Sequence, residues 1–574
     1  MSAATLAEPA TLALALGRPQ FADGALQAVQ ARDGDLAAWQ AAFAQADPAT
    51  VLARVGGDFA VALTLPDGRQ LLAVDRFAIR TLCYRIDPAG DRSVLRVAEQ
   101  ADALAGAGPG SGGRVDRQAL FDYLYFHAIP SPGTAHPGVL RLPPAHCLVF
   151  DGRHATVTPY WVPTFQDRGP TPRPSFDQLR DEFRRLLRDA VAATADPARP
   201  ASFLSGGTDS STVAGMLREA TGQKPATFSI GFDAEGYDEM AYARIAAQRF
   251  DTEHHEYYVT PDDLVRSMPE VAAGYDQPFG NSSALPAYFC ALMAKREGVR
   301  RILAGDGGDE LFGGNLRYAK QRVFNVYDHV PGPLRSALLE PVLGTRAARQ
   351  LPLVRKAASY VAQAREPLPQ RLETYNLLLR LGLADVLTPA FRAQVDEQGP
   401  IKAQQVVWQG ARTGSLLNRQ LAFDWRYTLA ETDLPKVCGT TRLAGLEVAF
   451  PMLDAQLVDF SLRLPADDKL KGLKLRWFFK EALRGFLPDE IIHKKKQGFG
   501  LPFGVWTQRH AGLKALAADA LGSLSTRNLV RPPFLDSLLH QRLPEHPGYY
   551  GEMVWILTML ELWLRAHAPQ FRIE

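Results

Sequence analysis

Apolar and polar positions change their spacing along this chain, and the change divides it into a front part and a longer second part. Up to about residue 160, short apolar runs are separated by turn residues, a pattern typical of antiparallel strands. The runs 58–65 and 70–77 flank a Pro-Asp-Gly turn and predict a hairpin, and 146–152 with 154–161 predict another. The front part is therefore expected to be β-rich.

From about residue 176 the pattern predicts helices that alternate with short apolar strands, which is typical of a parallel α/β sheet. The segment 163–175 is rich in proline and polar residues and is interpreted as a linker. We therefore expect a β-rich domain over 1–162 and an α/β domain over 176–574, in which 316–430 is mainly helical. Strands are predicted over 201–204, 226–232, 255–259 and 299–305, and helices over 212–220 and 237–250.

Composition and charge narrow the class of protein. A single core stops growing beyond roughly 250–300 residues, so a length of 574 favours at least two domains. With 46% hydrophobic and 22% charged residues, the chain is typical of a soluble globular protein. Its net charge of +2 gives no electrostatic signature for nucleic acid. No membrane span is predicted, because no run of about 18 apolar residues occurs.

The cysteines indicate the compartment. Cys83, Cys147, Cys290 and Cys438 are far apart and form no CxxC pair, so neither a disulfide framework nor a zinc site is predicted. The first residues contain a glutamate and no basic segment, unlike a secretory signal. These features are those of a large cytoplasmic protein, a class in which enzymes are common.

Two glycine-rich loops follow predicted strands of the α/β part. SGGTDSS occupies 205–211 after the strand 201–204, and DGGDELFGG occupies 306–314 after the strand 299–305. The carboxyl ends of parallel strands meet at one edge of a sheet, where ligands bind in open α/β folds. We therefore expect both loops to open on the same edge.

The first loop has the composition of a phosphate-binding loop. Gly206 and Gly207 lack Cβ atoms, so their backbone N–H groups can approach an anion closely. The helix that follows presents its positive dipole end to the loop. Because no Gly-Lys-Ser/Thr follows, this is not a Walker A loop. Hydroxyl donors come from Ser205, Thr208, Ser210 and Ser211.

Asp209 places a carboxylate inside this loop, where it would repel phosphate unless a cation lay between them. Mg²⁺ is the natural cation, because it prefers oxygen ligands and is usually held by one or two carboxylates and substrate phosphates. Asp306, Asp309 or Glu310 of the second loop could supply the other carboxylate. Alone, each loop could be an ordinary turn or a solvated acidic segment, but their matching positions favour a ligand site.

Further motifs carry a family resemblance. SGGTDSS resembles the pyrophosphate-binding loop of ATP pyrophosphatases, and the full series of motifs is similar, in order, to the synthetase domain of asparagine synthetases. The series continues with FSIGF (228–232), YDEMAYAR (237–244), HHE (254–256), DQPFGNSSALP (276–286), GDGGDELFGG (305–314), LEVAFPMLD (446–454) and KKKQGFGLPFGVW (494–506). The resemblance implies an adenine nucleotide α-hydrolase-like fold, with ATP and Mg²⁺ as cofactors. It also implies a reaction in which a carboxylate becomes an acyl-adenylate that an amine converts to an amide.

The resemblance implies roles for individual residues. Leu204, Ile230 and the pair Ala304–Gly305 match positions that line the adenine pocket, although they could also be plain sheet core. Residues 205–211 would hold the pyrophosphate end of ATP.

Charged residues complete the site that the resemblance implies. Asp209 and Asp309 match Mg²⁺-binding carboxylates. Lys496 matches a lysine that reaches the reacting phosphate and stabilises its negative charge, although Lys494–Lys495 have the same chemistry and the run could be a solvated surface. Asp306 is the candidate base for the attacking amine.

The front domain resembles the later part of a class II glutaminase, an Ntn-hydrolase-like fold, through VGGDFAVAL (55–63), LAVDRFAIRTLCY (72–84) and the segment 123–148. That glutaminase uses a cysteine directly after the initiator methionine, and the freed amine serves as its general base. Ser2 occupies this position here. The resemblance therefore predicts a degenerate domain that has lost glutamine hydrolysis and is structural, or binds a partner.

Relatives that lack the nucleophile include β-lactam synthetases, carbapenam synthetases and lasso peptide cyclases, in which the amine belongs to the substrate. Cys438 and Gly439 replace an Asp-Arg pair usual in asparagine synthetases, and Ala449 replaces a usual arginine, in a region that faces the acceptor in relatives. A lasso peptide macrolactam synthetase is favoured. Its partners would be a precursor peptide, a leader peptidase and a leader-binding protein.

Other hypotheses remain open at this point. A β-lactam synthetase is less favoured, because such relatives have a tyrosine where this chain has Asp306. An ammonia-dependent asparagine synthetase, or a ligase of sugars or small metabolites, would act on a different carboxylate. A non-catalytic scaffold is the alternative of another class, and the intact loops and Lys496 argue against it.

Overall fold

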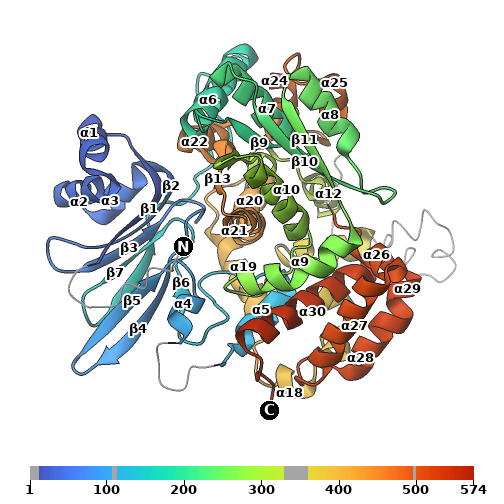
Figure 1. Cartoon of the computed structure of the whole chain (residues 1–574). Helices are drawn as coiled ribbons and strands as arrows, with labels where there is room; N and C mark the ends of the chain where they lie inside the picture. The colour runs from blue at the N-terminus through green and yellow to red at the C-terminus, as the bar shows by residue number, and fades with distance from the viewer. Residues whose placement is uncertain (1–11, 107–112, 329–359, 495–499) are drawn as a thin grey trace.

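The computed structural model describes residues 12–106, 113–328, 360–494 and 500–574. Figure 1 shows a front domain of blue and cyan strands beside a larger domain, in which helices surround a parallel sheet. The two domains are in contact, because apolar side chains between 115 and 135 pack into the core of the larger one.

Antiparallel strands build the front domain, as its short apolar runs predict. The two predicted hairpins are present as β2–β3 and β7–β8, with Ala60 of β2 opposite Val74 of β3. Both belong to a five-stranded sheet in the order β1-β2-β3-β7-β8, and β5-β4-β6 form a second sheet. The elements are β1 (Ala13–Phe21), α1 (Gly24–Asp33), α2 (Asp35–Gln45), α3 (Pro48–Ala53), β2 (Val55–Thr64), β3 (Gln70–Val74), β4 (Cys83–Ala89), β5 (Arg92–Ala98), α4 (Asp102–Ala105), α5 (Arg117–Phe126), β6 (Leu140–Arg141), β7 (His146–Phe150) and β8 (Ala155–Pro159).

Both faces of the five-stranded sheet are buried, because its strands point alternate apolar residues to opposite sides. One face packs against α2 and α3, where Trp39 is fully buried. The ring centroid of Trp39 lies 5.0 Å from that of Phe21 and 5.0 Å from that of Phe59. On the other face, Leu72 packs in a cluster with Leu95 of the second sheet. The predicted β-rich N-terminal domain is confirmed.

A five-stranded parallel sheet forms the centre of the larger domain, which confirms the predicted α/β fold. Its order is β11-β10-β9-β12-β13, so β9 pairs with β10 on one side and with β12 on the other. The strand order therefore reverses beside β9, and such a reversal opens a ligand crevice at the carboxyl ends of the strands. The strands are β9 (Ala201–Phe203), β10 (Ala226–Phe232), β11 (Glu253–Val259), β12 (Arg301–Leu303) and β13 (Glu447–Ala449).

Helices pack against this sheet and against one another (Figure 1). Among those that contact the strands, α7 packs on β9 and α10 on β10. The C-terminal helix α30 is largely buried, and Tyr123 of α5 donates a hydrogen bond to its Ile556 carbonyl at 2.8 Å. Within the part of the chain that the structure describes, no helix is both long and apolar enough to cross a membrane.

The described residues of 316–430 are mainly helical, as predicted. The helices of the larger domain are α6 (Phe176–Thr194), α7 (Thr208–Thr221), α8 (Met240–Arg249), α9 (Pro261–Gly274), α10 (Ala284–Arg296), α11 (Gly308–Phe312), α12 (Leu316–Asp328), α16 (Leu377–Leu381), α17 (Leu383–Val386), α18 (Pro389–Arg392), α19 (Gly399–Gly410), α20 (Leu416–Asp424), α21 (Leu434–Leu443), α22 (Ala455–Arg463), α23 (Ala466–Lys469), α24 (Trp477–Ala482), α25 (Asp489–His493), α26 (Phe503–Arg509), α27 (Ala511–Ser525), α28 (Pro532–Ser537), α29 (Leu543–Glu545) and α30 (Pro547–His567).

Two boundaries near the glycine-rich loops differ from the sequence prediction. Helix α7 begins at Thr208 rather than at 212, so half of the predicted loop is its first turn. The acidic loop 306–314 likewise contains the short helix α11. Polar residues predict a loop at both places, but the same residue types also favour the start of a helix, where they complement its free N–H groups and dipole.

Candidate functional site

The structure brings the two glycine-rich loops together at the carboxyl ends of β9 and β12. Their backbones are in contact, because a Cβ atom added to Gly305 would lie 2.9 Å from the amide nitrogen of Ser210. Asp209 and Asp309 lie in the first turns of α7 and α11, which both start at this edge. The two loops therefore form one site, as expected from the parallel sheet.

Hydroxyl groups hold the first loop in shape. The Ser205 amide donates to the Ser210 hydroxyl at 3.1 Å, and the two hydroxyl oxygens are 3.0 Å apart. Gly206 has a φ of +69°, and a Cβ atom there would overlap the backbone of Ala243. Gly207 is the N-cap of α7 without a side-chain cap, so the first N–H groups of the helix face the loop. This arrangement suits an anion.

Two further residues of the predicted loop lie in the first turn of α7. The Thr208 carbonyl accepts a hydrogen bond from the Thr212 hydroxyl at 2.6 Å, which is an ordinary helical contact. The Ser211 side chain is fully buried, and its hydroxyl has no hydrogen-bond partner among the described residues. Their contact with phosphate remains a prediction.

The residues predicted to line the adenine pocket lie in or directly after three neighbouring strands. Leu204 and Ala304 follow β9 and β12 and are each 1% exposed, and Ile230 is buried in β10. Gly305 is half-buried beside the first loop. The side chains of Leu204, Ile230 and Ala304 are thus part of the sheet core. The contact of all four residues with adenine remains a prediction.

A single guanidinium joins the two predicted metal ligands. Nη1 of Arg476 donates to Asp209 Oδ2 at 2.7 Å and to Asp309 Oδ1 at 2.9 Å, and its Nη2 contacts the other oxygen of Asp209. Burial lowers the pKa of Arg476, but the two carboxylates raise it by more. Asp209 and Asp309 therefore lie close enough to share one cation, and their carboxylate oxygens are the ligands that Mg²⁺ prefers.

The sequence did not identify Arg476, because nothing in its surroundings distinguishes it from the other basic residues. Its backbone is in the left-handed region, with a φ of +54°, directly before α24. Non-glycine residues in the left-handed region are uncommon, and those that do occur are often found at functional sites. That signal is visible only in the structure.

Asp306, the predicted base, lies in a different charge cluster. Lys436 Nζ is 3.7 Å from Asp306 Oδ1 and 3.1 Å from Asp433 Oδ1. Removal from water raises the pKa of Asp306 to about 6, with Lys436 lowering it and Asp433 raising it. Asp433 ends a π-helix, η4 (Trp425–Asp433), and such helical turns are frequent at functional sites. Sequence reasoning did not identify Lys436 or Asp433 either.

Lys496 lies outside the described residues, so its predicted role stays a prediction. Its neighbour Lys494 is described and contacts the first loop. Lys494 Nζ donates to the Gly206 carbonyl at 3.2 Å, forms an ion pair with Glu239 at 2.9 Å and lies 4.5 Å from the ring centroid of Tyr242. Only 7% of its side chain is exposed, so this lysine is not part of a solvated surface run.

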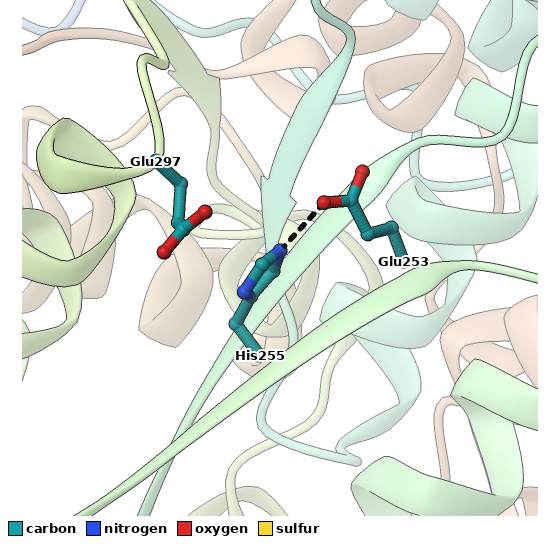
Figure 2. A group of neighbouring side chains, drawn as sticks. All are labelled: Glu253, His255 and Glu297. Carbon is teal, nitrogen blue, oxygen red and sulfur yellow. Dashed lines mark hydrogen bonds and ion pairs between the residues drawn. The ribbon is translucent and has the colours of Figure 1, made fainter.

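A second group of potential metal ligands lies away from this site. Figure 2 shows Glu253, His255 and Glu297 close together, with a hydrogen bond of 3.1 Å between His255 and Glu253. Glu253 is the first residue of β11, at the amino end of the parallel strands, whereas the loops lie at the carboxyl ends. Arg199 also pairs with Glu253 at 3.1 Å. This exposed cluster does not belong to the loop site.

The residues that depart from the usual asparagine synthetase pattern have structural partners. Cys438 points its thiol at the Ile79 carbonyl of the front domain, 3.8 Å away. Gly439 makes room for Tyr275, since a Cβ atom at 439 would lie 2.5 Å from that ring. The Ala449 carbonyl accepts a sheet hydrogen bond at 2.9 Å. This segment therefore connects the site region to the front domain.

Comparison with known proteins identifies both domains. A family model described as asparagine synthase matches residues 182–565, and one described as a glutamine amidotransferase domain matches 33–161. A putative glutamine-hydrolyzing asparagine synthetase of Mycobacterium bovis is 28% identical over 528 residues, which cover 89% of this chain and 77% of that protein. A glutamine-hydrolyzing asparagine synthetase of Bacillus subtilis is 24% identical over 86% of this chain and 74% of that protein.

A third relative is similar over a shorter segment. A putative asparagine synthetase of Methanocaldococcus jannaschii is 37% identical over 208 residues, or 36% of this chain and 39% of that protein. The asparagine synthase model alone matches well over half of the chain and includes both glycine-rich loops, Arg476 and Lys436. The chain therefore belongs to the asparagine synthase family and is an ATP-dependent carbon–nitrogen ligase that forms amides and releases AMP.

Proposed function

We propose that this enzyme closes the macrolactam ring of a lasso peptide. In this proposal an Asp or Glu side chain of a precursor peptide is adenylated, and the peptide's own N-terminal amine displaces AMP. A leader peptidase would expose that amine, and a leader-binding protein would deliver the precursor. The observation that carries the proposal is the burial and raised pKa of the cysteine thiols. It indicates whether the amine is released from glutamine on this chain or supplied in another way.

All four cysteines of the chain are described, and burial raises the pKa of each thiol. Cys83 and Cys290 are buried, and burial raises the pKa of both thiols. Burial also raises the pKa of Cys147, and that of Cys438 to about 12. A thiol nucleophile needs a lowered pKa and access to its substrate. This supports an amine that comes from the substrate or from free ammonia rather than from glutamine hydrolysed on this chain.

The first half-reaction suits the loop site. A carboxylate oxygen of the substrate attacks the α-phosphorus of ATP, and pyrophosphate leaves with the electron pair of the broken P–O bond. The backbone N–H groups of residues 205–211 would donate hydrogen bonds to the leaving pyrophosphate and stabilise its negative charge. Asp209 and Asp309 would hold Mg²⁺, which, when bound, would neutralise charge on the phosphates.

The second half-reaction needs a proton acceptor. The amine attacks the acyl carbon, AMP leaves with the electron pair of the broken C–O bond, and the amine nitrogen gives up a proton. We assign this proton to Asp306, since a pKa of about 6 leaves it ionised at neutral pH yet more basic than an ordinary aspartate. Lys436 would favour the ionised form.

A second candidate is an ammonia-dependent asparagine synthetase. The named relatives are described as glutamine-hydrolyzing asparagine synthetases, and the raised thiol pKa values favour free ammonia over glutamine as the nitrogen source here. Both candidates are tested side by side. Purified enzyme is incubated with ATP and Mg²⁺, in one arm with a leader-cleaved precursor peptide encoded beside its gene, in the other with aspartate and ammonium. Loss of one water from the peptide, with AMP formed in equal amount, is the expected result.

Matched variants identify the site responsible. Asp209→Ala should abolish product formation, whereas Asp459→Ala, a change at an exposed carboxylate paired with Arg76, should not. Asparagine in the second arm and an unchanged peptide in the first would replace the cyclase proposal by the synthetase. Absence of pyrophosphate release in both arms would favour a non-catalytic scaffold.

A further inference from the structure

We propose that Arg476 competes with the divalent cation for Asp209 and Asp309, so that the enzyme takes up the cation only together with ATP. The inference rests on the proposed Mg²⁺–ATP site. It concerns the order in which that site fills, and it makes Arg476 a positioning residue of the nucleotide site.

The first observation is how fully Arg476 engages the carboxylates. Two of its nitrogens contact both oxygens of Asp209, and one of these nitrogens also donates to Asp309 Oδ1 at 2.9 Å. A cation held by either oxygen of Asp209, or by Oδ1 of Asp309, would need an oxygen that the guanidinium already contacts. The cation and the Arg476 guanidinium would also repel each other, because both are positively charged and would contact the same carboxylates.

The second observation is that the fold holds Arg476 in place. Its amide donates to the Gly313 carbonyl at 3.2 Å, which ties it to the acidic loop. Its guanidinium carbon lies 4.1 Å from the ring centroid of Phe479, and only 5% of the residue is exposed. Ion pairs on the surface usually contribute little to stability, because both side chains are mobile in water. Arg476, in contrast, is buried and held in one position.

The third observation is the shape of the space around the pair. A Cβ atom at Gly308 would overlap the Asp209 carboxylate, and one at Gly314 would overlap the Asp309 carboxylate. The acidic loop thus passes so close to both carboxylates that only glycine fits at these positions. The same two glycines also leave room for Arg476, since the added Cβ atoms would lie 3.0 Å from its Nη2 and 2.8 Å from its Cδ.

ATP changes the balance of charge at this place. Its triphosphate would supply several negative oxygens as partners for the Arg476 guanidinium, and Asp209 and Asp309 would then be available to hold the cation. Without nucleotide, a cation must displace charge-assisted hydrogen bonds and gains no phosphate ligands in exchange. The cation is therefore expected to bind weakly alone and strongly with the nucleotide.

The test measures Mn²⁺ binding to the full-length protein by electron paramagnetic resonance in the absence of nucleotide. Arg476→Met, which keeps the length of the side chain but removes its charge, should bind Mn²⁺ at least about tenfold more tightly than wild type, the factor expected from losing one charge-assisted hydrogen bond. Adding Asp209→Asn to this variant should remove the gain. Arg463→Met, at an exposed ion pair with Glu182, is the matched control and should bind like wild type.

If the methionine variant does not fold, Mn²⁺ binding is measured for Arg476→Lys and for the wild type instead. The lysine variant retains the charge with fewer contacts and should bind Mn²⁺ more tightly than wild type. Tight nucleotide-free binding by wild type, lost in Asp209→Asn, would overturn the inference even if the enzyme makes amide. Conversely, an enzyme that shows the expected Mn²⁺ pattern but forms neither amide product refutes the proposed reaction and not this competition.

Discussion

Replacing Lys436 by methionine should raise the pH at which amide formation is half-maximal by about one to two units. Lys436 Nζ lies 3.7 Å from Asp306 Oδ1, and its positive charge favours the ionised form of that carboxyl group. Asp306 can accept a proton only when ionised, so the rate should fall as the pH drops through its pKa. Without Lys436 the neutral form of Asp306 is favoured, so the pKa of this carboxyl group rises above about 6. The acidic limb of the rate profile therefore moves to higher pH.

The magnitude follows from the geometry. Two unit charges about 4 Å apart interact by about 4 kcal/mol at an effective dielectric constant of 20. Because 22% of the Asp306 side chain and 16% of the Lys436 side chain are exposed, solvent reduces this value. An opposite charge at such a distance typically shifts a carboxyl pKa by 1–3 units, at about 1.4 kcal/mol per unit. An upward shift of about one to two units is therefore expected.

The assay is the rate of amide formation between about pH 5 and pH 9 at saturating substrates. The free amine also titrates, but equally for both enzymes, so the difference between their profiles belongs to the protein. ATP–pyrophosphate exchange stops at the adenylate and should keep the wild-type pH profile. Lys402→Met, which removes an exposed ion pair with Asp396, is the matched control. Superimposable amide profiles of Lys436→Met and wild type would refute the role of Asp306 as the base.

Two further predictions concern the loop and the stability of the larger domain. Lys494→Met should raise the KM for ATP by about tenfold, because it removes the hydrogen bond that Lys494 donates to the Gly206 carbonyl of the phosphate loop. It also leaves the largely buried Glu239 without its ion-pair partner, so the melting temperature should fall as well. Initial rates at varied ATP, measured well below the melting temperature, check the KM, and a kcat effect without a KM effect would contradict the prediction. Glu561→Gln should lower the free energy of unfolding, measured by urea denaturation, by about 3–5 kcal/mol. The reason is that the fully buried Glu561 carboxylate pairs with Arg527 at 2.6 Å. A loss below about 1 kcal/mol would show that the pair is dispensable.

Much of the fold was predictable because it depends on local patterns. Alternation of apolar residues in 58–65 and 70–77, with a turn between them, predicts the hairpin that the structure shows. The short apolar strands followed by glycine-rich segments likewise predict a parallel sheet with loops at one edge. Helix starts were less predictable, as at Thr208, because the polar residues of a first turn are also those of a loop.

The sequence by itself determined the type of fold, the two loops and the residue types that suit a nucleotide, since these depend on neighbours along the chain. Only the tertiary structure decided which charges meet. Arg476 reaches Asp209 across 267 positions and Asp309 across 167, and nothing local marks that contact. Lys436 likewise meets Asp306 only through the packing of α21 beside the acidic loop. Burying a charge is costly unless an opposite charge compensates it, and which partner does so depends on how the whole chain packs.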